Sequence, residues 1–217
     1  MHIYEGILAA TPHGRELLLA GAAAAAVGTA IGLRKLDYER VPKVAVLSAA
    51  FFVASLIHVP LGPTSVHLVL SGLLGLVLGW AAFPAVLVGL ILQAVFLSFG
   101  GPSTLGINTL VMALPAVACY YLFHGLARDG NEPRAFLAGF AAGATAIVLG
   151  ALLTAAVLML AGREFAAFGP AVVAAYLPAA AIEGLITGSV VVFVRKVRPE
   201  LLDAPLLPST CPEVIDG

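Results

Sequence analysis

Apolar segments of helix length follow one another along most of the chain, separated by short stretches that contain charges, glycine or proline. A backbone inside lipid has to satisfy its own polar groups, so such segments favour helices. We expect seven helices, over residues 16–33, 43–58, 66–79, 82–98, 107–127, 134–161 and 170–194. The third is short, and the stretch from Trp80 to Pro84 predicts a tight turn into the fourth. The pattern predicts an all-α helix bundle.

The amino-acid composition places this bundle in a membrane. Of 217 residues, 61% are apolar and 11% are charged, against about 45–50% and about 25% in soluble domains. With 11 Lys and Arg against 12 Asp and Glu, no basic surface is available for phosphates, which excludes a nucleic-acid-binding protein. We expect one polytopic domain over residues 1–198 in a lipid bilayer, followed by a loosely ordered cytoplasmic tail over 199–217.

The distribution of arginine and lysine predicts the orientation. If the N-terminus is outside, the inner loops hold nine of these residues and the outer side holds only Arg15 and Arg163. Positively charged loops stay in the cytoplasm, so we expect the N-terminus outside and the C-terminus inside. A signal peptide carries positive charge before its apolar stretch. No such charge occurs here, so we expect residues 1–8 to remain on the mature protein.

The chain lacks the motifs of an ATPase and of a zinc protease. None of its three lysines follows a glycine, so no Walker motif is present, and no His-Glu-x-x-His string occurs. The sequence therefore indicates a protein that is not an enzyme. An intramembrane protease that pairs Ser71 or Ser98 with His124 stays an alternative, although the expected topology puts these residues at different depths.

His2 is special by its position. An α-amine followed by a histidine offers three nitrogens in a row: the Met1 amine, the His2 amide nitrogen and the His2 Nδ1. A metal on these atoms closes a five-membered and a six-membered ring, and one further imidazole completes a square. His67 is the first candidate for it. Planar nitrogen sites suit Ni(II) or Cu(II), whereas Zn(II) prefers a tetrahedron. The competing interpretation is a structural or interfacial histidine.

The predicted topology also places the other histidines. His58 ends the second helix on the outer side, and two prolines after it forbid a continuous helix. We expect His67 to open the third helix, with Thr64 or Ser65 as its N-cap. His124 falls at the inner end of the fifth helix and is interpreted as an interfacial residue.

Three stretches of the chain resemble the CbiM/NikM family. They are Met1-His2-Ile3-x-Glu5-Gly6, the segment from Ser55 to Leu68 with its Thr-Ser-x-His motif, and the segment from Gly106 to Ala113. The family often has Asp where Glu5 stands. The resemblance covers nearly the whole chain. It implies that the metal is held by the amine of Met1, by the backbone and side chain of His2, and by His67.

The same resemblance implies a function and partners. Members of this family are the substrate-binding membrane subunits of nickel and cobalt energy-coupling-factor transporters. The resemblance implies an ABC-type importer in a prokaryotic cytoplasmic membrane, with Ni(II) or Co(II) as the transported substrate. The implied partners are a transmembrane coupling subunit, two cytoplasmic ABC-type ATPases and a small accessory membrane subunit. The binding subunit would topple in the bilayer upon ATP hydrolysis, with the Ala-rich first helix as docking face.

A vitamin-binding subunit of the same transporter class is a further alternative. Such a subunit needs a larger and more aromatic pocket and has no need for His2. One Trp and five Tyr are a thin aromatic supply for that role.

Several polar residues are candidates to support the metal ligands. Thr64, Ser65 and His58 lie in the second of the three stretches. Asn108 and Thr109 open the fifth helix beside a glycine-rich loop, where they can hydrogen-bond the ligand imidazoles or the loop. A helix N-cap is the other interpretation of this pair.

Two more polar residues lie deep in apolar segments. Glu183 in the last helix is interpreted as a protonated structural group or a helix tie, and a charged metal ligand is the less favoured option. Gln93 in the fourth helix carries the same ambiguity.

Overall fold

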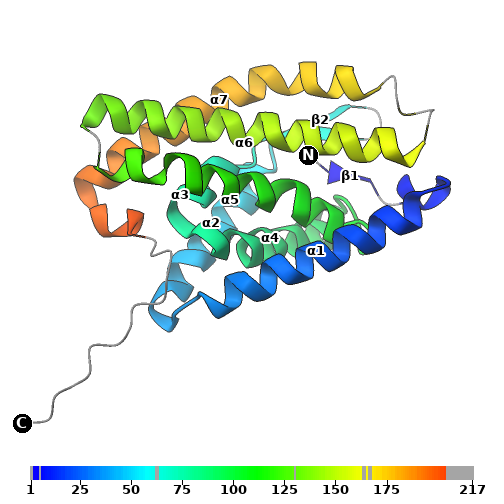
Figure 1. Ribbon diagram of the computed structural model, residues 1–217, viewed down its shortest axis with the longest axis horizontal. Coiled ribbons are helices and arrows are strands. Elements are labelled where there is room, and N and C mark those ends of the chain that lie inside the picture. Colours follow the sequence, from blue (N-terminus) through cyan, green and yellow to red (C-terminus); the bar gives the residue numbers. More distant parts are fainter. Residues whose placement is uncertain are drawn as a thin grey trace, which may run out of the picture.

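A computed structural model of the chain shows a bundle of helices with a small sheet at one end (Figure 1). The structure describes residues 2–4, 6–61, 64–129, 131–162, 165 and 168–203; over 58–61 and 64–66 it describes the backbone. The helices are α1 (Gly14–Arg34), α2 (Val41–Ala54), α3 (Ser71–Leu78), α4 (Ala82–Leu97), α5 (Leu105–Asp129), α6 (Glu132–Ala161) and α7 (Phe168–Val197). The strands are β1 (His2–Ile3), β2 (His58–Leu61) and β3 (Thr64–His67).

Five helical segments of the described chain are long and apolar enough to cross a membrane. They are Gly14–Arg34, Ser71–Leu97, Leu105–Asp129, Glu132–Ala161 and Phe168–Val197. The predicted helical membrane bundle is therefore confirmed. The predicted seven crossings are not, because the eight residues of α3 rise only about 12 Å, against a hydrocarbon core of about 30 Å. The orientation of the two ends stays a prediction.

The chain reverses direction between α3 and α4, as the sequence predicted. Gly79 has a φ of 56°, a conformation that glycine adopts without strain. Gly75 of α3 packs against Ala116 in the middle of α5. Leu90 of α4 lies beside Asn108 near the start of α5. The chain therefore runs parallel to α5 along α3 and returns along α4.

Small residues let α3, α6 and α7 approach closely. A Cβ added at Gly143 of α6 would lie 2.6 Å from the carbonyl oxygen of Glu183 in α7. A Cβ added at Gly139 would lie 2.8 Å from the Cα of Gly188. Contact distances this short exclude any side chain, so backbone packs on backbone where α6 crosses α7.

The segment between α2 and α3 corrects three predictions. The second helix ends at Ala54, and His58 lies in strand β2 rather than at a helix end. His67 is the last residue of strand β3, and α3 begins only at Ser71. Thr64 and Ser65 therefore belong to β3 and cap no helix. The physical reason is that the prolines of this segment interrupt helical hydrogen bonding, whereas a hairpin pairs the backbone groups of the residues around them.

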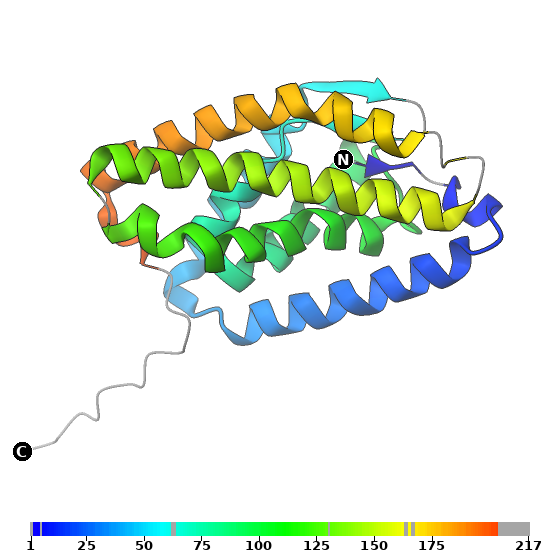
Figure 2. The same cartoon turned by 45° about the horizontal axis from the view of Figure 1, so that its top comes forward.

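At the end of the bundle opposite the sheet, where α5 and α7 end (Figure 2), basic side chains bind residues that follow α7. Arg40 donates a hydrogen bond to the backbone oxygen of Asp203 at 2.8 Å, and Lys43 donates one to that of Leu201 at 2.9 Å. Arg128 forms an ion pair with Asp203 at 3.1 Å. The start of α2 and the ends of α5 and α7 therefore meet at this end.

Part of the region predicted as a loose tail closes this basic end. Pro199–Leu202 forms a 3-10 helix, and the Leu202 side chain is buried. His124, predicted at the inner end of its helix, contacts the Leu202 carbonyl oxygen with Nε2 at 2.6 Å. Residues 204–217 of the predicted tail lie outside the described residues.

Candidate metal site

The N-terminal strand completes a three-stranded sheet. The strand order is β1-β3-β2, with both pairs antiparallel. His2 lies opposite Ser65 and Ile3 opposite Thr64, while His58 lies opposite His67 across the hairpin. Figure 1 shows β1 inserted among the helices rather than on the outside of the bundle. Backbone pairing thus fixes the first residues of the chain against the segment that carries His67.

Asn108 holds the other edge of β1. Its Oδ1 accepts the amide hydrogen of Ile3 at 2.9 Å, and its Nδ2 donates to the Ile3 carbonyl oxygen at 3.1 Å. The carboxamide therefore takes the place of a neighbouring strand. Nδ2 also donates to the Thr104 hydroxyl at 3.3 Å. The N-cap interpretation of Asn108 is wrong, because α5 begins at Leu105.

His2 and His67 are brought together in the interior. Their ring centroids are 4.6 Å apart, and the ring planes are 19° from parallel. His2 is 1% exposed and His67 is 2% exposed. Phe99, in the loop after α4, lies with its ring centroid 6.0 Å from that of His2. Two residues 65 positions apart in the sequence thus form one buried imidazole pair.

The tautomer of His67 follows from a backbone contact. Its Nδ1 lies 2.9 Å from the carbonyl oxygen of Leu68. A carbonyl oxygen only accepts, so this hydrogen bond requires the proton on Nδ1 and leaves the lone pair on Nε2. Histidines that bind metals commonly make this contact through their second nitrogen, which fixes the ring orientation.

A glycine loop closes over the pair. Gly100 has a φ of 70°, a conformation that favours glycine. A Cβ there would lie 3.1 Å from Asn108 Nδ2 and 3.6 Å from His2 Nδ1. The cavity between His2, this loop and Leu90 is too small to admit a water molecule. The imidazole pair is therefore enclosed.

The structure places the remaining predicted residues as follows. Met1 lies outside the described residues. His58, Thr64 and Ser65 are described by their strand backbones. The Thr109 hydroxyl donates to the carbonyl oxygen of Leu105 in its own helix at 2.8 Å, so it bonds neither the imidazoles nor the loop.

Side chains alone do not form a complete metal site here. Within the described ranges, no three His, Cys, Asp or Glu side chains cluster in a way that could hold a metal ion. Two imidazoles leave two corners of a square coordination plane to other donors. The sequence predicts the Met1 amine and the His2 amide nitrogen as these other donors.

Glu183 has a role that the sequence left open. Its carboxyl oxygens accept hydrogen bonds from the backbone amides of Val69 and Leu70, which lie between His67 and α3. Glu183 is completely buried. Of the interpretations made from the sequence, the helix tie is the one that these contacts describe. Gln93 is also completely buried, and its amide atoms have no hydrogen-bond partner among the described residues.

The serine–histidine pairs of the protease alternative are not brought together. Ser98 precedes the loop that contacts Asn108, and His124 lies 16 residues after Asn108 on the same helix, which is about 24 Å along its axis. Ser71 begins α3, four residues before the Gly75–Ala116 contact in the middle of the bundle.

The fold and the relatives of the chain define its class, a multi-pass membrane protein of the transition-metal transporters. Two crystal structures, described as a transition metal transporter and as its truncated form, match with TM-scores of 0.75 and 0.75. The former is 28% identical and the match covers 91% of this chain and 93% of that one. The truncated form is 27% identical, with 90% and 99% covered.

The chain belongs to the CbiM family, described as the cobalt uptake substrate-specific transmembrane region, whose model matches residues 2–201. A putative metal transport protein of Haemophilus influenzae is 42% identical, with 94% of this chain and 97% of that protein covered. The cobalt transport protein CbiM of Sorangium cellulosum is 31% identical, with 94% and 95% covered. The fused nickel transport protein NikMN of Rhodobacter capsulatus is 32% identical, with 84% and 59% covered.

Proposed function

We propose that this protein captures Ni(II) or Co(II) from outside the cell through four nitrogens and passes the ion inward. The donors are the Met1 amine, the His2 amide nitrogen, the His2 Nδ1 and the His67 Nε2. The buried His2–His67 pair is the observation that carries the proposal. Relatives named as cobalt and nickel transport proteins support the choice of ions.

The spacing of the two rings fits this arrangement. With metal–nitrogen bonds of about 2.0 Å, two imidazoles at neighbouring corners of a square have ring centroids roughly 4.5 Å apart. The His2 and His67 centroids are 4.6 Å apart. A deprotonated amide and a planar set of nitrogens suit the square geometry of Ni(II). The enclosed position of the pair supports a site that strips the ion of its water.

The chain would act as the substrate-binding subunit of an energy-coupling-factor importer. Its partners would be a transmembrane coupling subunit, two cytoplasmic ATPases and a small accessory membrane subunit. The basic end of the bundle would face the cytoplasm, because positive charge is retained there. The sheet and the imidazole pair would then face outward, where the ion arrives.

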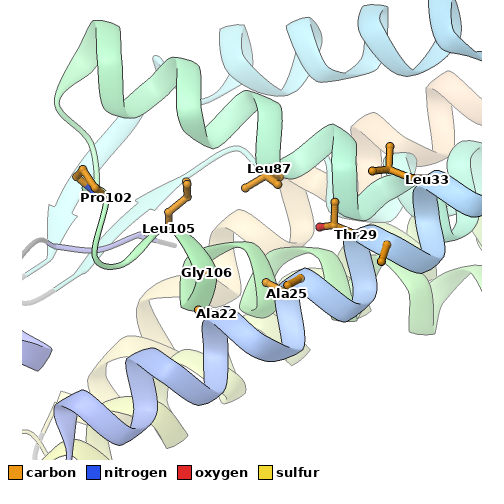
Figure 3. A pocket seen from close by; sticks show the side chains of 10 residues that line it. Ala22, Ala25, Thr29, Leu33, Leu87, Pro102, Leu105 and Gly106 are labelled. Atoms are coloured by element: carbon orange, nitrogen blue, oxygen red, sulfur yellow. The ribbon is translucent and has the colours of Figure 1, made fainter.

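The first helix offers a docking face for the coupling subunit. An apolar cavity of about 510 Å³ lies between α1, α4 and the start of α5 (Figure 3). Ala22 and Ala25 of α1 line it together with Leu105 and Gly106 of α5. Side chains this small leave room for a partner helix to pack closely in lipid.

The state of the amino terminus tests the proposal. The full chain is purified metal-free with a native N-terminus, and a second preparation carries a short N-terminal extension. We expect tight Ni(II) binding and a yellow, diamagnetic complex in the first preparation and loss of both in the second. Equal Ni(II) affinity in the two preparations, measured by isothermal titration calorimetry, would show that the amine is dispensable and that the site is wrong.

A further inference from the structure

The carboxyl group of Glu183, in the last helix, accepts hydrogen bonds from the backbone just after His67. Glu183 lies in α7, 116 residues after His67 along the chain. Its Oε1 accepts the amide hydrogens of Val69 and Leu70, the latter at 2.8 Å, and its Oε2 accepts that of Leu70 at 3.0 Å. Both amides lie within three residues of His67, in the turn between β3 and α3.

This turn is held in an unusual backbone conformation. Leu70 has a φ of 56°, and it immediately precedes the first residue of α3. A left-handed conformation at a branched, non-glycine residue costs about 1–2 kcal/mol. The amides of the Leu68–Val69 and Val69–Leu70 peptides both donate to the Glu183 carboxyl group, and these hydrogen bonds offset such a cost.

The same turn sets the direction of the His67 ring. His67 Nδ1 contacts the carbonyl oxygen of Leu68, which lies directly before Val69. Any rotation of the Leu68–Val69 peptide moves this carbonyl oxygen, and the Val69 amide hydrogen is held by Glu183. The carboxylate, the peptide and the imidazole therefore form one chain of contacts.

We infer that Glu183 is a positioning residue for His67, a step that depends on the metal site proposed above. By holding the 67–70 turn against α7, its carboxylate orients the imidazole so that Nε2 meets the metal beside His2. Glu183 itself does not bind the ion. Residues that support metal ligands in this way typically contribute about 10- to 100-fold to metal affinity.

The test compares Glu183→Gln with a matched control on the same helix. Leu70 donates to both carboxyl oxygens, so the amide group of glutamine would direct its own N–H toward the Leu70 N–H. The control is Thr187→Ala, because Thr187 lies one turn further along α7 and is equally buried. Both variants are made in the full chain with a native N-terminus, and the folded monomer is isolated.

The expected result is an affinity for Ni(II) about 10- to 100-fold lower in Glu183→Gln, with a shifted or broadened visible absorption band. Thr187→Ala is expected to keep the wild-type affinity and band. Thermal stability is measured in parallel, since a purely structural role would lower stability in Glu183→Gln and leave the affinity and spectrum of the folded fraction unchanged. That outcome would overturn the inference.

Two further measurements cover a Glu183→Gln chain that does not fold. Glu183→Asp keeps the charge but withdraws the carboxylate by one methylene, and we expect an intermediate loss of affinity. In the wild-type protein, Ni(II) should slow hydrogen exchange at the Val69 and Leu70 amides. Unchanged exchange on metal binding would overturn the coupling between this turn and the site.

The two proposals fail in different ways. A wild-type chain that binds no Ni(II) refutes the metal site. A wild-type chain that binds Ni(II), loses it in His67→Ala and keeps it in Glu183→Gln and Glu183→Asp retains the site and refutes the positioning role.

Discussion

The two ends of the bundle are built by different interactions. At the sheet end, His2 and His67 lie buried between paired strands, and an amide side chain holds the strand edge. At the other end, Arg128 and Asp203 form an ion pair in which each side chain is 54% exposed. One end uses backbone pairing and a buried imidazole pair in a dry interior, and the other uses charges at the aqueous surface.

The two kinds of interaction differ in how much free energy is lost when one partner is removed. Exposed ion pairs contribute about 0–1 kcal/mol because water and salt screen them. Buried polar groups cost several times more when their partner is removed, since no water replaces it. We therefore expect substitutions at the sheet end to change metal binding strongly, and substitutions at the basic end to change it little.

The largest effect is expected from the ligands themselves. His2→Ala and His67→Ala each remove one nitrogen donor, and we expect Ni(II) affinity to fall by more than about 100-fold, beyond the range of supporting residues. His124→Ala is the control at the opposite end, where the ring contacts Leu202, and it should bind as the wild type does. Isothermal titration with Ni(II) measures all three. Retention of affinity in His67→Ala would break the contrast between the two ends.

The second-largest effect is expected at the strand clamp, the Asn108 carboxamide that holds the edge of β1. Asn108→Leu removes both hydrogen bonds to the Ile3 backbone, so β1 loses its hold on that edge, and we expect affinity to fall about 10- to 100-fold. Thr109→Val serves as the matched control, because the Thr109 hydroxyl donates its hydrogen bond to the Leu105 carbonyl oxygen in its own helix. Competition with a metal-binding dye gives both dissociation constants. Equal constants for the two variants would show that the clamp does not act on the site.

A smaller effect is expected at the loop that closes the site. Gly100→Ala forces a side chain into a left-handed conformation, which costs about 1–2 kcal/mol of stability. The new Cβ also crowds Asn108, which holds β1 beside the site, so Ni(II) affinity should fall as well. Gly125→Ala is the comparison in α5, where no atom lies within 4 Å of the added Cβ. It should stabilise the helix by about 1 kcal/mol. Thermal unfolding should therefore give shifts of opposite sign, and shifts of the same sign would contradict this account.

The smallest effect is expected at the basic end. Arg128→Gln breaks the exposed pair with Asp203, and we expect a loss of stability below about 1 kcal/mol. Raising the ionic strength should reduce this loss further, because salt screens exposed charges. Ni(II) affinity should stay at the wild-type value. Thermal unfolding at low and high salt checks the first two statements, and a loss of metal binding would refute the third.

The sequence by itself determined the membrane class, the helical bundle and the reversal near Trp80. These properties follow from local composition, since long apolar segments need helices in lipid and the α3–α4 turn needs a glycine-compatible conformation. The N-terminal histidine could also be singled out, because its nitrogens are adjacent in the covalent chain. His67 is indicated as its partner by its predicted place on the same side of the membrane, although it ends β3 rather than opening a helix. The family follows from the match over residues 2–201.

Tertiary structure decided how these pieces meet. The chain between α2 and α3 forms a hairpin instead of a helix end, and β1 joins this hairpin from the start of the chain. Asn108 holds Ile3 of that strand although the two are 105 residues apart in the sequence. Glu183 accepts a hydrogen bond from Val69, in the turn after His67, although these two are 114 residues apart. Such contacts depend on which groups burial brings together. A buried polar group has to form its hydrogen bonds with the groups that folding places within reach.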